Sequence, residues 1–219
     1  MTPSEKSNLF VKHAKRLCRR HGVSLRFLKS KYASTDGRDK VQGYFCEGDD
    51  EEKPHIIIAK ENNRTDWLGT LCHELGHMFQ WLEGDLTYEA LDYSETDANS
   101  IFDEYDSTYE ERKHAMLLVL ANELDAERRA VDMILKWGLP INVERYIKQS
   151  NAILYYHHIA LETEKWAAKK TLNSKRILEK MPSTFDNDYS TIPDDIKELM
   201  LRVNKEKQDA YLRIQMRKM

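Results

Sequence analysis

The chain has 219 residues, 41% of them hydrophobic and 32% charged, with a net charge of −3 at pH 7. This composition predicts a soluble globular protein with one substantial core, and it excludes the strongly basic overall field of many nucleic-acid-binding proteins. The local basic run Lys15, Arg16, Arg19, Arg20 and Arg26 is interpreted as a solvated helix face. Nucleic acid is therefore not favoured as a partner, although recruitment by DNA or RNA stays open.

The cysteine content indicates the redox compartment. Cys18, Cys46 and Cys72 are few, odd in number and widely spaced, which argues against a disulfide framework and favours a reducing environment. The N-terminal residues contain no apolar segment of signal-peptide length, and no stretch reaches the apolar length of a membrane helix. We expect a cytoplasmic protein with no membrane partner.

The N-terminal third predicts a helix and then a small sheet. Thr2-Pro3-Ser4-Glu5 is typical of a helix start, and Gly22 is a stop signal. Turn residues Thr35-Asp36-Gly37 separate the first two of three strand-like runs, and the acidic segment Glu47–Glu52 predicts a solvated hairpin loop before the third. The runs are Val23–Leu28, Val41–Cys46 and Ile56–Ala59.

The remainder predicts helices. Asp66 or Thr65 is expected to cap a helix that ends at Gly84, and residues 85–107 predict a surface loop or a short helix. Further helices are expected at 109–137, at 142–170 and from Pro193 onward, with a loop at 181–192. A small early sheet followed by helices indicates an α+β fold. We predict a core domain at 1–140 and a helical extension at 141–219 that packs on it.

The segment His73-Glu74-Leu75-Gly76-His77 places two histidines one helical turn apart. At about 100° per residue, the apolar residues of this helix fall on one side and both histidines on the other, where two imidazoles can reach one ion. Zinc accepts two neutral imidazoles and leaves room for a third ligand and water. Glu74 is displaced around the helix, as expected of a base that contacts water. The alternative is a surface helix with ordinary histidines.

The helix predicted at 109–137 carries two acids on its apolar side. Glu123 and Glu127 share that side, whereas Asp125 falls on the opposite, polar side and is not favoured as a ligand. The apolar residues beside the two glutamates are Met116, Leu120, Ala130, Val131, Ile134 and Trp137.

A buried carboxylate needs a partner, because burying an unpaired charge is costly. A zinc ion held by the two histidines would pair Glu123, and a hydrogen bond to a ligand imidazole would satisfy Glu127. A buried ion pair, for example with Arg64 or His114, is the alternative that stays open.

The segments His73-Glu74-Leu75-Gly76-His77 and Glu123-Leu124-Asp125-Ala126-Glu127 together resemble the gluzincin metallopeptidases. The second segment is similar to the E-x-E-A-D signature of the membrane-bound M48 peptidases and to its counterpart in the small soluble ImmA/IrrE-type proteins. Asp125 and Glu127 stand where Glu and Asp are usual. The resemblance covers about Phe10 to Trp137.

This resemblance implies a minimal zincin-like core of helix, three-stranded sheet, histidine helix and glutamate helix. It implies that His73, His77 and Glu123 bind Zn²⁺ and that Glu127 contacts a ligand imidazole. The C-terminal tail is also similar to that of uncharacterised phage and viral proteins, which would place a phage-encoded enzyme in the host cytoplasm.

The activity that the resemblance implies is zinc-dependent hydrolysis of a protein or peptide substrate, with Glu74 as the general base. In this family the edge strand beside the histidine helix pairs with an extended substrate, and Ile56–Ile58 fits that position. A second oxyanion donor is commonly a Tyr or His of a later helix. Among residues 155–158 we prefer Tyr156 and His157, and core aromatics are the alternative.

Two other functions stay open. A zinc-binding interaction module that hydrolyses nothing is the first, and the presence of Glu74 argues against it because a structural site needs no base. A helical adaptor without metal is the second, in which arginines neutralise Glu123 and Glu127. The cleavage sequence and the oligomeric state are not predicted.

Overall fold

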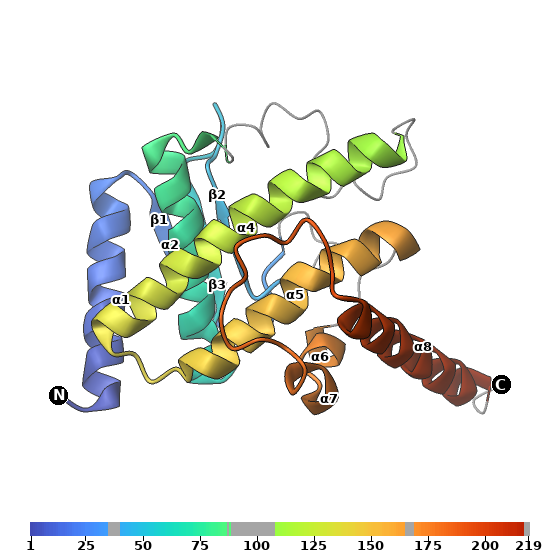
Figure 1. Cartoon of the computed structure of the whole chain (residues 1–219). Coiled ribbons are helices and arrows are strands. Elements are labelled where there is room, and N and C mark those ends of the chain that lie inside the picture. The colour runs from blue at the N-terminus through green and yellow to red at the C-terminus, as the bar shows by residue number, and fades with distance from the viewer. Residues whose placement is uncertain (35–39, 87, 89–107, 165–168, 217–219) are drawn as a thin grey trace. The chain divides into compact units, whose positions relative to one another are not determined.

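The computed structural model describes residues 1–34, 40–86, 88, 108–164 and 169–216 (Figure 1). Its elements are of the α+β class, as the sequence predicts, with a small sheet early in the chain and helices after it. By its internal contacts the chain divides into two units, Met1–Glu89 with Leu124–Val143 and Ala90–Glu123 with Glu144–Met219. This division does not coincide with a boundary after residue 140, because helix α4 (Tyr109–Trp137) contributes to both units.

The first unit begins with α1 (Pro3–Arg20), whose start is a reciprocal capping box. The Thr2 hydroxyl accepts from the Glu5 backbone N–H at 3.2 Å, and the Glu5 carboxylate accepts from the Thr2 N–H at 2.6 Å. The buried residues Phe10, Ala14 and Cys18 recur at helical spacing and form the inward side of α1.

The sheet contains β1 (Ser24–Leu28), β2 (Gly43–Cys46) and β3 (His55–Ala59), all within two residues of the predicted runs. Their spatial order is β1-β3-β2, with β1 parallel and β2 antiparallel to β3. The prediction that Ile56–Ile58 forms a sheet edge is therefore wrong. Those residues lie in the central strand, which suits their continuous apolar sequence because a central strand is buried more completely than an edge strand.

The acidic segment between β2 and β3 forms a hairpin connection, as predicted. The Asp49 carboxylate accepts from the backbone N–H groups of Glu51 and Glu52, both at 2.8 Å, and these bonds lower its pKa. Gly48 has a φ of 80°, and a Cβ there would lie 2.2 Å from the Glu52 carbonyl oxygen. The Asp49 side chain and the backbone of the same loop thus satisfy one another.

Helix α2 (Arg64–Glu83) carries the histidine motif. Its N-cap is Asn63, whose side chain accepts from the Thr65 N–H at 3.3 Å, so the predicted cap at Asp66 or Thr65 is wrong by two to three residues. Asp66 instead lies in the first turn, where the helix dipole favours an acid. The helix ends at Gly84 in the left-handed conformation, as predicted.

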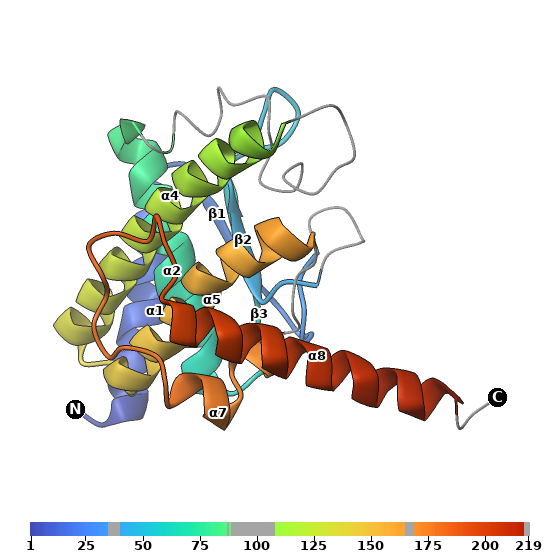
Figure 2. The same ribbon diagram turned by 45° about the vertical axis from the view of Figure 1, so that its right-hand side comes forward.

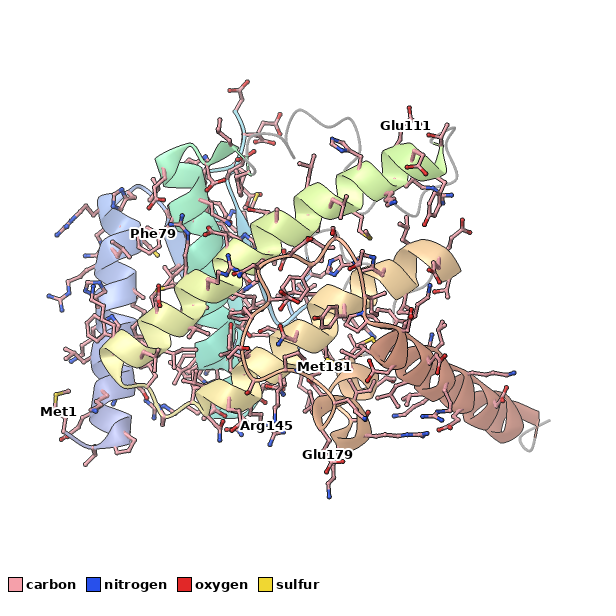
Figure 3. The ribbon with its side chains drawn as sticks, viewed as in Figure 1. Met1, Phe79, Glu111, Arg145, Glu179 and Met181 are labelled. Carbon is pink, nitrogen blue, oxygen red and sulfur yellow. The ribbon has the colours of Figure 1, made fainter. Side chains whose placement is uncertain are left out.

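Helix α2 is buried on more than one side. Its apolar stripe is covered by the sheet and by α1, where Met78 meets Cys18 at 3.9 Å between sulfur atoms. Phe79 lies on the side of α2 that faces α1 (Figure 3). On another side α4 crosses α2 so closely that a Cβ at Gly76 would lie 2.8 Å from the Ala126 carbonyl oxygen.

The second unit is built around α5 (Val143–Thr163), with α6 (Lys169–Leu172), α7 (Lys175–Leu178) and α8 (Asp194–Met216) after it. Helix α8 packs on α6 and α7 (Figure 2). The helix predicted at 142–170 ends earlier, at Thr163, because Glu164 has a φ of 54° that a right-handed helix does not allow.

The predicted loop at 181–192 is confirmed, and a buried side chain of α5 holds it. The Asn151 amide donates to the carbonyls of Pro182 at 2.9 Å and Thr184 at 3.0 Å, and the Tyr189 hydroxyl donates to the Asn151 carbonyl oxygen. The predicted turn at 35–37 and most of the predicted segment 85–107 lie outside the described residues. Among the helices that the structure describes, none is long and apolar enough to span a membrane.

Candidate metal centre

Helix α2 brings His73 and His77 together at their ring Nε2 atoms, which lie 3.1 Å apart. The ring centroids are 4.6 Å apart and the planes nearly perpendicular, at 88°. Two imidazoles bound tetrahedrally to one zinc ion at ordinary bond lengths have nitrogens roughly 3.3 Å apart. The separation observed here fits that requirement, and the spacing of four residues on a helix explains it.

Glu74 belongs to the same group. One ligand atom from each of His73, Glu74 and His77 lies within 4.8 Å of the others, so these three residues can hold a metal ion. Glu74 is only 6% exposed. A buried carboxylate next to two imidazole nitrogens can serve as a ligand or as a base for water near the ion.

The far side of His73 faces an acid on α4. Its Nδ1 lies 3.4 Å from Glu127 Oε1, and both side chains are largely buried. A carboxylate only accepts hydrogen bonds when ionised, so this contact favours the tautomer of His73 with the proton on Nδ1. The close approach of α4 at Gly76 places Glu127 within this distance.

The far side of His77 faces Gln80, a residue that the sequence reasoning did not identify. His77 Nδ1 lies 2.8 Å from Gln80 Oε1, and the Gln80 amide nitrogen lies 3.0 Å from Asp125 Oδ2. Asp125 is 38% exposed at its side chain, in keeping with its predicted polar side, and it binds Arg129 at 2.6 Å. The available signal in the sequence was a polar residue three positions after His77, on the same side of α2.

The ion pair considered for the buried acids does not involve Arg64. The Arg64 guanidinium bonds the Asn8 side chain at 2.6 Å and the Ser4 hydroxyl at 3.3 Å, both on α1. Glu127 instead contacts His73, within the part of the chain that the structure describes.

The other predicted site residues lie in the second unit. Glu123 is the last residue of that unit on α4, and its charge raises the pKa of His157, although burial lowers that pKa more strongly. His157 Nδ1 donates to the Ile153 carbonyl at 3.0 Å. The Tyr156 hydroxyl accepts from the Asn204 amide at 3.0 Å, and burial raises its pKa. Asn204 is thus a hydrogen-bond partner of Tyr156. The catalytic roles predicted for Tyr156 and His157 stay predictions.

Comparison with known proteins gives no further guide. No protein-family model, no curated protein and no solved structure matches the chain. The site is thus established as a histidine–glutamate–histidine group that can bind a metal ion, without the identity of the metal.

Proposed function

We propose that the chain is a zinc-dependent metallopeptidase of the gluzincin type that hydrolyses a protein or peptide substrate. The observation that carries the proposal is the 3.1 Å separation of the His73 and His77 Nε2 atoms beside the buried Glu74. Each histidine also presents Nδ1 to an oxygen, Glu127 in one case and Gln80 in the other. With the proton of each neutral ring on Nδ1, both Nε2 atoms present lone pairs to the space between them, which is the arrangement that a shared cation requires.

Glu123 is the proposed third ligand, and the continuity of α4 supports it. Glu123 lies four residues before Glu127 in one unbroken helix, which places both side chains on the same side of α4 about 6 Å apart along its axis. Glu127 contacts His73. Two histidines and a glutamate form a ligand set typical of catalytic zinc sites, which leave one position open.

Glu74 is the proposed general base. A zinc ion bound by these side chains would make water a nucleophile at neutral pH and stabilise negative charge on the scissile carbonyl. Glu74 accepts the proton of the attacking water and then delivers it to the leaving amine. Its burial suits this role, because a site that largely excludes bulk water reserves the carboxylate for the attacking water.

The substrate is proposed to pair with β2 rather than with β3, because β3 is the central strand. Helix α2 packs against β2, and no strand in the described residues pairs with the other edge of β2. An extended peptide could add to that edge through backbone hydrogen bonds.

The test compares the metal content and the peptidase activity of purified variants. We expect about one zinc per chain in the wild type and loss of zinc in His73→Ala and in Glu123→Ala. Glu74→Gln should retain zinc and lose hydrolysis of an unstructured protein such as casein, by at least about 100-fold. His21→Ala removes an exposed histidine and serves as the matched control with unchanged zinc.

Two outcomes would contradict the proposal. A wild type that binds no zinc removes the metal site altogether. If the wild type binds zinc but hydrolyses the substrate no faster than Glu74→Gln, the chain is a zinc-binding interaction module instead.

A further inference from the structure

Gln80 is a fully buried amide beside the two histidines, with 0% of its surface exposed. Both ends of the amide are bonded, the oxygen to His77 Nδ1 at 2.8 Å and the nitrogen to Asp125 Oδ2 at 3.0 Å. A buried amide is costly unless its groups are paired, so this arrangement satisfies a group that an apolar residue would avoid.

The direction of the amide follows from Asp125. Asp125 Oδ2 accepts from the Arg129 guanidinium at 2.6 Å, and Arg129 also binds Glu83 at 2.9 Å. A carboxylate oxygen that accepts from a guanidinium also acts as an acceptor toward Gln80, so it faces the NH₂ group of that amide. The reversed amide would place two acceptor oxygens about 3.0 Å apart, which is repulsive.

The direction of the amide in turn decides the tautomer of His77. Because the Gln80 oxygen can only accept, His77 Nδ1 must carry the proton and donate it. The lone pair of the neutral ring is then on Nε2, the atom that lies 3.1 Å from His73 Nε2. His77 is thereby prepared as a ligand before any ion arrives.

We propose that Gln80, Asp125 and Arg129 form a positioning relay that holds His77 in the tautomer and orientation required for metal binding. This inference rests on the proposed metal site. The Asp125 carboxylate, held by Arg129, sets the direction of the Gln80 amide. The direction of that neutral amide then sets the tautomer of His77. None of the three residues belongs to the group that can hold the ion, so they would act through His77.

The first experiment reads the tautomer of His77 in the metal-free protein, by two-bond ¹H–¹⁵N NMR correlations of the imidazole rings. In the wild type we expect the proton on Nδ1. Gln80→Leu removes the acceptor, and we expect the proton to move to Nε2 in a substantial fraction of molecules. Thr70→Val removes a hydroxyl elsewhere on α2 that donates to a backbone carbonyl, and it should leave the tautomer unchanged.

The second experiment measures Zn²⁺ affinity by competition with a chromophoric chelator. We expect Gln80→Leu to bind Zn²⁺ about 10- to 100-fold more weakly than the wild type, as is usual when a partner of a ligand histidine is removed. Asp125→Asn should weaken binding by less, because Gln80 retains an acceptor oxygen at residue 125. Glu83→Gln, which changes the exposed second partner of Arg129 outside the relay, should change the Zn²⁺ affinity by about twofold or less.

A double variant separates positioning from simple packing. The double variant Gln80→Glu with Asp125→Asn exchanges the amide and the carboxylate between the two positions. The carboxylate at position 80 can accept from His77 Nδ1 and from the amide at position 125, so both hydrogen bonds of the relay are kept. We expect the double variant to regain the Nδ1 tautomer and a Zn²⁺ affinity within about threefold of the wild type. Gln80→Glu alone should bind Zn²⁺ more weakly than the double variant, because two carboxylates then face one another.

The relay is refuted if Gln80→Leu keeps both the Nδ1 tautomer and the wild-type Zn²⁺ affinity, or if the double variant binds no better than Gln80→Leu. A failure of the proposed function gives a different result. The wild type would then bind no Zn²⁺. The tautomer measurement on the metal-free protein would still show whether Gln80 holds His77 in the Nδ1 tautomer.

Discussion

Helices α2 and α5 each carry two histidines, but they use them differently. On α2, His73 and His77 are four residues apart and point their Nε2 atoms at one another. Behind them, His77 Nδ1 bonds the Gln80 oxygen at 2.8 Å, and His73 Nδ1 lies 3.4 Å from a Glu127 oxygen. On α5, His157 and His158 are adjacent and each bonds a backbone carbonyl, one in the preceding turn and one in the loop at 181–192. Adjacent helical residues diverge by about 100°, so the α5 rings cannot converge as those of α2 do.

Two features make the histidine pair of α2, and not that of α5, a candidate metal site. Helical spacing lets the two rings meet, and an acceptor behind each ring leaves both facing nitrogens with lone pairs. Each histidine of α5 instead bonds a backbone carbonyl of its own unit, which is the ordinary behaviour of buried histidines.

The largest expected effect is on the metal. His77→Ala should abolish measurable Zn²⁺ binding, because it leaves only one of the two imidazole ligands of the proposed site. His158→Ala should leave Zn²⁺ binding intact and lower the free energy of unfolding by about 1–3 kcal/mol, since it removes the bond to the Tyr189 carbonyl. Calorimetric titration with Zn²⁺ and chemical denaturation of both variants test the contrast. Equal loss of Zn²⁺ binding in both variants would contradict it.

An intermediate effect is expected where α4 crosses α2. Gly76→Ala places a Cβ 2.8 Å from the Ala126 carbonyl oxygen. This oxygen belongs to the backbone of α4, which cannot move aside as easily as a side chain. We expect a loss of about 1–3 kcal/mol in unfolding free energy from overpacking and a weaker contact between Glu127 and His73. Zn²⁺ affinity should fall by about 10-fold.

The matched control for this change is Gly22→Ala, where nothing lies within 4 Å of the new Cβ and only the φ of 75° opposes it. Its cost should be about 1 kcal/mol with unchanged Zn²⁺ affinity. If Gly76→Ala kept wild-type affinity for Zn²⁺, close packing of α4 on α2 would not be needed for the site.

The smallest expected effect concerns pH. Burial lowers the pKa of His158 below its ordinary 6.5, so the unfolded chain binds a proton that the folded chain does not. The stability that neutral His158 contributes is therefore present above about pH 6.5 and is lost as the pH falls below it. In His158→Gln, which can still donate to the loop carbonyl, unfolding free energy should fall less steeply between about pH 7.5 and about pH 5.5. Urea titrations at several pH values measure these slopes, and parallel slopes would contradict the assignment.

Much of the fold could be predicted from local sequence. The capping box at Thr2 and Glu5, the stop at Gly84 and the helix 109–137 are encoded by neighbouring residues, and the structure has them. The order of the strands could not be predicted in this way. Ile56–Ile58 is compatible with either a central or an edge position until its pairing partners are known.

In the candidate site, too, local sequence predicted one part and the tertiary structure decided another. The spacing of His73 and His77 by itself determined that their rings meet, because a helix repeats every 3.6 residues. Only the tertiary structure decided which residues of α4 lie behind the rings: Glu127 contacts His73, and Asp125 holds the Gln80 amide that lies behind His77. Both acids lie more than forty residues further along the chain, and helical periodicity carries no information about how two helices cross.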